Sequence, residues 1–330
     1  MTREPKAGIT LAQATLLLIA MIALIFALDV IPRARDENYA WLIRNNQTLD
    51  PELGFFPLPN KHYSWTDPHG NFENVSTNEM GFRGRAFASQ KKGKRVLLLG
   101  SSMVFGYGVQ EDETIGAQLQ EIYDRENYPA EVLNAGIKCF SNDQTYKLLT
   151  SRLFKLKPDR IVWFLTADNF SKNVDIDVSL YDYNATNDQL VERKLESSLF
   201  YLSSQFVLRF NENQKFSIID MLFTMANESM ARLNGFFEGE SKLNKFRIFS
   251  EQISKSDLDN SVQTTFVVLP DRYRRNHLSR LSQYSTLPII DLNDEGSFRK
   301  NWEHLFLNDD FHLSKTGNLE VAKFVRNLSE

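Results

Sequence analysis

Cysteine and histidine are scarce in this chain of 330 residues. The single cysteine, Cys139, excludes a disulfide within the chain and a cysteine-rich zinc site. Glycine and proline, at 15 and 10 residues, are too few for a collagen-like or low-complexity protein. Chemistry that needs an imidazole must draw on only five histidines, which are His62, His69, His277, His304 and His312.

An excess of basic residues is also absent. Lys and Arg together number 38 against 42 Asp and Glu, a formal net charge of −4. A general nucleic-acid binder normally carries a basic excess, so we expect no nucleic-acid partner. The mean hydropathy of −0.36 excludes a polytopic membrane protein. The length and the 42% hydrophobic content nevertheless suffice for a large buried core.

The hydrophobic residues are concentrated in one uncharged segment, residues 9–28. A helix of this length spans about 30 Å, which is the thickness of the hydrocarbon core of a bilayer. The alternative is a cleaved signal peptide, whose apolar region is usually shorter and precedes a small-residue cleavage site. The segment instead runs into Asp29 and Pro32, a poor cleavage site, so an uncleaved transmembrane anchor is favoured.

Orientation of the anchor rests on the lengths of the flanking segments, because basic residues flank both of its ends. A short N-terminal tail such as residues 1–8 usually stays in the cytoplasm, and a long following domain can be translocated regardless of its charge. We therefore expect a single-pass protein of the cell membrane with its large domain on the extracytoplasmic (periplasmic) side. The lipid bilayer is then a partner of residues 9–28.

Beyond the anchor the chain divides into a connector and a domain. Residues 29–90 have little periodicity and several prolines, so we predict a connector that packs on the domain. From residue 91 onward, apolar segments typical of buried parallel strands alternate with segments of helical spacing. The predicted strands lie at residues 95–99, 132–133, 160–165, 265–269 and 288–291. Helices are predicted from about residues 115, 274 and 314 onward. A further helix is predicted after Asp143, which would be its cap.

This order predicts an α/β domain over residues 91–330, with a doubly wound, flavodoxin-like parallel sheet of five strands. An insertion at about residues 173–243 interrupts it. The aromatic residues of the insertion favour packing against the core, and a lid near the active site is the alternative. Ligands of such sheets bind beyond the carboxyl ends of the strands. Four positions are singled out for this reason: Gly100, Asn134, Thr166 and Asp291.

The loop after the first strand, residues 100–108, contains two serines and three glycines. It could be a phosphate-binding turn, the elbow of an α/β-hydrolase, or a loop that presents a nucleophilic serine. Its glycines suggest a phosphate-binding turn, but the dinucleotide and P-loop motifs are both absent. The Gly-x-Ser-x-Gly elbow of α/β-hydrolases is absent too. Ser102 still lies where a hydroxyl would be presented to a cleft, so it can act as a nucleophile if a base reaches it.

A candidate base comes from the end of the chain. His312 lies three residues after Asp309, in a loop that leads into the last helix. His312 would take the proton from Ser102, while Asp309 would hold the ring and stabilise the imidazolium. Taken alone, the pair could also be metal ligands or an ordinary loop. Its place after the last strand of the sheet favours catalysis, with no metal and no cofactor.

Several short motifs, in order along the chain, resemble those of the SGNH (GDSL-type) hydrolases, and in particular the bacterial members with an N-terminal membrane anchor. Residues 100–109 resemble the nucleophile block, and residues 134–136 (Asn-Ala-Gly) resemble the second block. Residues 309–312 match the last block, and residues 78–84 resemble a segment that precedes the domain in anchored members. The resemblance implies Ser102 as nucleophile, His312 as base and Asp309 as its orienting carboxylate.

The oxyanion hole implied by the resemblance uses the backbone amides of Gly136 and Ser102, together with an asparagine side chain from a third block. Two departures occur. Ser101 replaces the usual aspartate before the nucleophile, which is a supportive position. Asp168 stands at the asparagine position, with Asn169 after it. A carboxylate cannot donate to the oxyanion, and losing one donor costs about 10²–10³ in rate. Asp168 could act protonated, or Asn169 could take its place.

The resemblance implies a membrane-anchored serine esterase or O-acyltransferase. Its substrate would be an acyl ester, such as an acetyl group on an envelope or exported polysaccharide. The alternative is a catalytically degraded SGNH domain that serves as a glycan-binding or assembly subunit at the membrane. Asp168 and Ser101 motivate the alternative, whereas the intact set of Ser102, Asp309 and His312 favours the enzyme. Nothing in the sequence distinguishes hydrolysis from transfer.

Overall fold

The computed structural model describes residues 46–67, 69–166, 170, 180–193, 239–255, 262–271, 281–296, 298, 302–308 and 311–328. The predicted cytoplasmic tail (1–8) and membrane anchor (9–28) lie outside these ranges and remain predictions. Within the ranges just given, no helix combines the length and apolar character needed to cross a bilayer.

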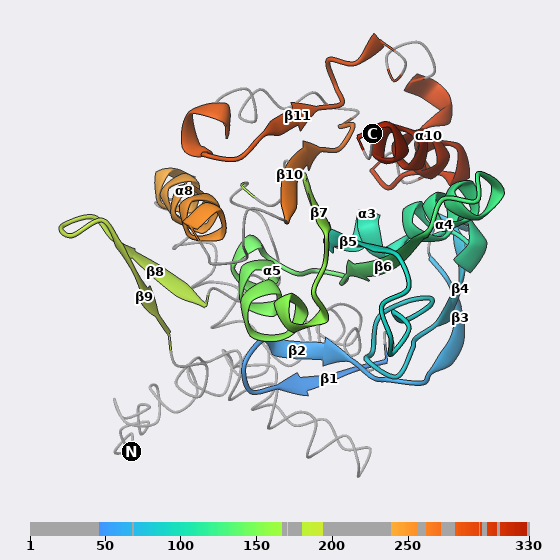
Figure 1. The fold of residues 1–330 in the computed structure, drawn as a ribbon, viewed down its shortest axis with the longest axis horizontal. Helices are drawn as coiled ribbons and strands as arrows, with labels where there is room; N and C mark the ends of the chain where they lie inside the picture. The colour runs from blue at the N-terminus through green and yellow to red at the C-terminus, as the bar shows by residue number, and fades with distance from the viewer. Residues whose placement is uncertain are drawn as a thin grey trace, which may run out of the picture.

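A five-stranded sheet forms the centre of the described domain, with the order β11-β10-β7-β5-β6 (Figure 1). Its neighbouring strands all run parallel. The strands are β5 (Lys94–Gly100), β6 (Ala130–Gly136), β7 (Arg160–Leu165), β10 (Gln263–Val268) and β11 (Ile289–Asp291). In chain order this is the flavodoxin-like arrangement, which confirms the predicted sheet. The direction of winding reverses between β5 and β7, and the ligand crevice of such folds opens at that point.

Helices cover both faces of this sheet because side chains alternate along its strands. On one face, Leu97 and Leu99 pack with α5 (Asn142–Leu148) and α8 (Gly239–Lys255). On the other, Val96 and Leu98 pack with α3 (Ser102–Phe105), α4 (Ile115–Arg125) and α10 (Lys315–Asn327). Figure 1 shows α4 and α10 beside one another, away from α5 and α8. Short helical turns complete the set: η1 (Glu111–Glu113), η2 (Leu149–Leu153), η3 (Phe154–Leu156) and η7 (Trp302–His304).

Side-chain caps begin α4, α5 and α10, and one predicted cap is wrong. Ser314 accepts the Gly317 N–H at 3.2 Å, so α10 starts where the sequence indicates. Helix α5 is capped by Ser141, whose Oγ accepts the Gln144 N–H at 3.3 Å, and not by Asp143. The buried carboxylate of Asp143 is used in tertiary contacts instead. It pairs with Lys245 of α8 at 3.0 Å and accepts backbone N–H groups of the insertion.

The described part of the predicted connector forms two antiparallel hairpins. They are β1 (Gln47–Asp50) with β2 (Gly54–Pro57), and β3 (His62–Thr66) with β4 (Phe72–Ser76). Strands of four or five residues show too few alternations of apolar and polar residues to be predicted from periodicity. The first hairpin packs on the core through Leu53 and Phe55, both fully buried. The segment is therefore a structured part of the domain's surface.

The described ends of the predicted insertion also pack on the core. Strands β8 (Tyr181–Asn184) and β9 (Gln189–Glu192) form a hairpin, and α8 follows. Tyr181 of β8 meets Tyr146 of α5 edge-on, with ring centroids 5.9 Å apart. The expected packing against the core is thus seen at the described ends of the segment. Residues 194–238, and with them the alternative of a lid, lie outside the described ranges, as does most of the helix predicted after residue 274.

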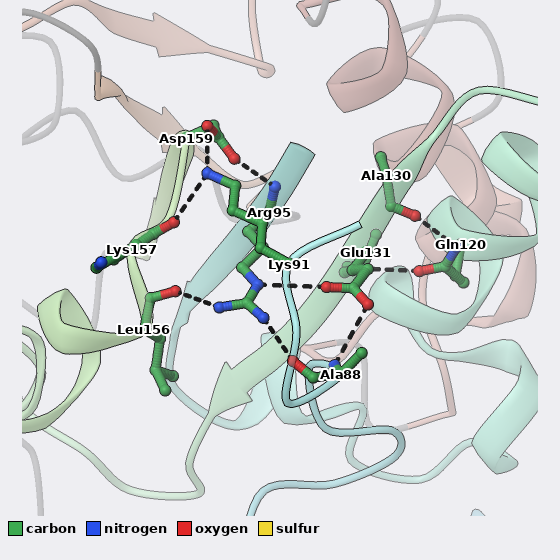
Figure 2. A network of polar contacts seen from close by, with 10 residues as sticks. Ala88, Lys91, Arg95, Gln120, Ala130, Glu131, Leu156, Lys157 and Asp159 are labelled. Carbon is green, nitrogen blue, oxygen red and sulfur yellow. Dashed lines mark hydrogen bonds and ion pairs between the residues drawn. The ribbon is translucent and has the colours of Figure 1, made fainter. Parts of the chain in front are cut away.

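Polar contacts join the amino ends of three central strands, at the opposite end of the sheet from the ligand crevice (Figure 2). The guanidinium of Arg95, at the start of β5, donates to Leu156 O at 2.7 Å and to Glu131 at 3.3 Å. Asp159, before β7, accepts the Arg95 N–H at 2.7 Å and Lys91 Nζ at 2.7 Å. Because these charges satisfy one another and backbone groups, this network has a structural role.

Candidate active site

Ser102 lies directly beyond the carboxyl end of β5, at the point where the winding of the sheet reverses. It is the first residue of α3, so its backbone N–H has no partner within the helix. Its Oγ lies 2.9 Å from Nε2 of His312, although the two residues are 210 positions apart in the chain. This is hydrogen-bonding distance between a hydroxyl and a potential base.

Backbone contacts hold the loop that carries His312. Phe306 and Leu313 form an antiparallel bridge, and Leu307 N–H donates to His312 O at 2.8 Å. Ser314 follows immediately and caps α10. The imidazole is thereby presented from the start of a helix that packs firmly on the sheet. Asp309, predicted to orient the ring, lies outside the described residues, and its role stays a prediction.

Aromatic rings surround the imidazole. Tyr107 stacks on His312 with a centroid distance of 4.1 Å and an interplanar angle of 22°. Phe311 meets the same ring edge-on, with centroids 4.8 Å apart. Trp65 of β3 contacts Tyr107 in turn, at 5.5 Å and 70°. The second hairpin therefore reaches the candidate base through one intervening ring.

A buried ion pair lies behind Tyr107. The Lys138 ammonium donates a hydrogen bond to the carboxylate of Glu73, which lies on β4. The side chains of Lys138 and Glu73 are 1% and 0% exposed. Burial lowers the pKa of Lys138, and the neighbouring Glu73 carboxylate opposes that shift. The Lys138 ammonium also lies over the rings of Phe105 and Tyr107, at 4.8 and 5.1 Å from their centroids. Sequence reasoning missed both charged residues, since nothing local marks either as buried.

A second buried cation, Arg83, joins the same hairpin to the nucleophile loop. Its guanidinium donates to Asn74 O at 2.7 Å and to Val109 O at 2.8 Å, and it also donates to Gly106 O. Arg83 therefore has a structural role, because it satisfies carbonyl groups on both sides of Tyr107.

Gly136, one predicted oxyanion donor, ends β6 beside Gly100 in the strand register. Its N–H donates to Asn134 Oδ1 at 3.1 Å, so this amide is engaged by a side chain of its own strand. Its place in an oxyanion hole stays a prediction. Glycine is required here for a steric reason. A Cβ would lie 2.3 Å from the Phe105 nitrogen and 2.6 Å from the Val104 carbonyl carbon, both in α3.

Gly136→Ala is therefore expected to push α3 and its Ser102 out of place. The overpacking should lower the free energy of unfolding by about 1–3 kcal/mol. Urea unfolding measures this effect. Gly296→Ala is the matched control, because a Cβ at Gly296 meets nothing within 4 Å. Equal behaviour of the two variants would contradict the close approach of β6 and α3.

The remaining predicted positions divide into three groups. Cys139 is half-buried and has φ +61°, a conformation that favours glycine. Asp291 accepts the N–H of Asn293 at 2.9 Å, so its carboxylate is used in a turn. Asp168 and Asn169 lie outside the described residues. Among the described ranges, no group of three or more His, Cys, Asp or Glu residues could hold a metal ion.

Comparison with solved structures returns lipases and carbohydrate esterases. A lipase/acylhydrolase from Enterococcus faecalis is 14% identical with a TM-score of 0.42, covering 71% of this chain and 95% of its own. The acetyl xylan esterase AlAXEase is 15% identical with a TM-score of 0.39, covering 71% and 98%. A two-domain esterase (CEX) active on acetylated mannans is 11% identical with a TM-score of 0.39, covering 72% and 49%.

Sequence comparison gives no further assignment, since no family model and no curated protein sequence matches the chain. The TM-scores of these three solved structures lie below 0.5, so their similarity indicates neither activity nor substrate for this chain. The chemistry of the site must be judged from its own residues. Those residues place a serine hydroxyl and an imidazole within hydrogen-bonding distance of each other, where the ligand crevice of a flavodoxin-like sheet opens.

Proposed function

We propose that this chain is an SGNH-type serine esterase or O-acyltransferase. The observation that carries the proposal is the 2.9 Å contact between Ser102 Oγ and His312 Nε2. The contact lies beyond the carboxyl end of β5, where doubly wound sheets place their ligands. A serine hydroxyl is a weak nucleophile unless a base removes its proton, and His312 is placed to do so.

The reaction would proceed by two acyl transfers. Ser102 Oγ attacks the ester carbonyl while its proton passes to His312 Nε2, which gives a tetrahedral oxyanion. The carbon–oxygen bond to the leaving alcohol then breaks, and that alcohol takes the proton from His312. Water, or a sugar hydroxyl, attacks the acyl-serine with His312 again as base. The bond between the acyl carbon and Ser102 Oγ then breaks, Oγ takes the proton back from His312, and the carboxylic acid or the new ester leaves the free enzyme.

Two supporting roles belong to the same proposal. Asp309 holds the second ring nitrogen of His312, as the spacing of the last block implies. The Ser102 amide, with Asp168 or Asn169, stabilises the oxyanion, and the Gly136 amide joins them when it exchanges Asn134 Oδ1 for the oxyanion. For the substrate we propose an acyl ester of a carbohydrate, such as an acetyl group on an envelope or exported polysaccharide. We also propose that residues 9–28 anchor the protein in the cell membrane with the domain on the periplasmic side.

The test is acyl release by the purified full chain in detergent. The assay supplies p-nitrophenyl esters of increasing chain length, and acetylated oligosaccharides with acetate detected directly. An esterase releases the acyl group in catalytic turnover, and a transferase releases more alcohol when a sugar acceptor is added. Binding of the oligosaccharide with no acyl release would instead identify a glycan-binding subunit, the alternative that Asp168 motivates.

Asp168→Asn is expected to raise kcat at neutral pH, by up to about 10²-fold, if the carboxylate occupies the oxyanion position. An amide can donate to the developing charge, whereas an ionised carboxylate repels it. Asn169→Ala is the companion variant, measured in the same esterase assay. An unchanged rate in Asp168→Asn, together with a loss in Asn169→Ala, would show that Asn169 is the donor.

A further inference from the structure

We propose that Tyr107 is a positioning residue for His312, held in place by the buried Glu73–Lys138 pair of the second hairpin. This inference rests on the proposed function, because it assigns Tyr107 the task of holding the candidate base toward Ser102. It extends the site beyond the serine, histidine and aspartate to a residue between the glycines of the nucleophile loop.

The stack restrains the one torsion that the base must keep. The terminal torsion of a histidine is broad, so packing must decide where Nε2 points. Tyr107 covers one face of the imidazole at 4.1 Å and 22°, and Phe311 closes off an edge at 88°. Rotation of the imidazole about its Cβ–Cγ bond would drive it into the Tyr107 ring. The stack therefore favours the orientation that places Nε2 2.9 Å from Ser102 Oγ.

Tyr107 can restrain His312 because the loop on both sides of it is fixed. Gly106 and Gly108 have φ values of +87° and +72°, conformations that favour glycine. Arg83 binds the carbonyl of Gly106, and Glu73 accepts the N–H of Gly108 at 3.1 Å. Both anchoring side chains are almost fully buried. They come from the segment before residue 91, which precedes the five-stranded sheet in the chain and packs on the same core.

The ring of Tyr107 is also supported from behind. Trp65 meets it edge-on at 5.5 Å, and the Lys138 ammonium lies 5.1 Å from its centroid. An ammonium over an aromatic face is attracted by the negative face of the ring. Glu73 neutralises Lys138, so the support adds no net charge beside the base. A chain of contacts thus runs from the hairpin through Tyr107 to His312.

The test compares Tyr107→Leu with Tyr107→Phe in the full chain, using p-nitrophenyl acetate. Loss of the flat ring should lower kcat about 10- to 100-fold with little change in KM, since misplacement of a catalytic group by about 1 Å can cost 10²-fold. Tyr107→Phe should recover most of the rate. Tyr128→Leu is the matched control, because it also removes a stacked tyrosine, 5.1 Å from Tyr123 and near the amino end of β6.

Reactivity of His312 toward diethyl pyrocarbonate supplies a readout that needs no esterase activity. Mass spectrometry of the peptide with His312 should show faster modification in Tyr107→Leu than in wild type or Tyr107→Phe. Tyr107→Met replaces Tyr107→Leu if the latter does not fold. Unchanged kcat and unchanged reactivity would overturn the inference, as would equal losses in Tyr107→Phe and Tyr107→Leu. If the wild type shows no ester turnover, but His312 is still modified faster in Tyr107→Leu than in the wild type, the proposed function is overturned. The contact between Tyr107 and His312 then still stands.

Discussion

Ser102→Ala and His312→Ala are each expected to lower kcat for ester hydrolysis by roughly 10³- to 10⁶-fold, because a nucleophile and its base act as one unit. For the same reason the double variant should lose little more than either single variant. The measurement is steady-state turnover of p-nitrophenyl acetate by the full chain. The prediction follows from the 2.9 Å contact of the two side chains.

Two neighbouring residues provide matched controls for these variants. Ser101→Ala removes the adjacent hydroxyl, and His304→Ala removes an exposed imidazole from η7. Both controls should keep turnover close to that of the wild type. Loss of activity in His304→Ala, with activity retained in His312→Ala, would show that His304 is the base and that His312 is not. Additive losses in the double variant of Ser102 and His312 would show that the two act independently.

Lys138→Met is expected to lower the free energy of unfolding by about 3–5 kcal/mol, because it leaves the carboxylate of Glu73 buried without its partner. Glu73→Gln should be costly for the reciprocal reason. The double variant Lys138→Met with Glu73→Gln removes both charges, so it should lose less than the sum of the two single losses. Urea unfolding of the four proteins closes this thermodynamic cycle.

The control for this cycle is Lys323→Met, which breaks an exposed pair with Glu320 on α10. Exposed pairs contribute little because water and salt screen them, so its unfolding midpoint should hardly move. A Lys138→Met midpoint equal to that of Lys323→Met would show that the ion pair does not hold the hairpin. Strictly additive losses in the double variant would show that the two buried charges are not coupled.

Much of the fold could be predicted because the central strands carry their signal locally. The apolar segments at residues 95–99 and 160–165 mark β5 and β7 without reference to the rest of the chain. The hairpins before residue 91 carry no such signal, since their strands have only four or five residues and prolines separate them. Asp143 shows the other limit, because a residue suited to a cap was used in a tertiary contact with Lys245.

The candidate site, too, could be predicted only in part. The sequence predicts that Ser102 and His312 lie close together, since both follow strands whose carboxyl ends meet at one edge of the sheet. The pairing of Glu73 and Lys138 could not be predicted, because they lie 65 residues apart and only the packing of a hairpin on the sheet makes them partners. Tyr107 was hidden for the same reason. Its sequence context shows a glycine-rich turn, whereas its stacking on His312 depends on the whole fold.

The most direct test of Ser102 as an activated nucleophile is the site of covalent modification by a fluorophosphonate, which reacts with activated serines. After reaction of the full chain, intact-mass measurement and peptide mapping identify the modified residue. We expect one adduct per chain, on Ser102, that is absent in Ser102→Ala and forms much more slowly in His312→Ala. An unmodified wild type, or a Ser102→Ala variant that is modified as readily, would contradict this expectation.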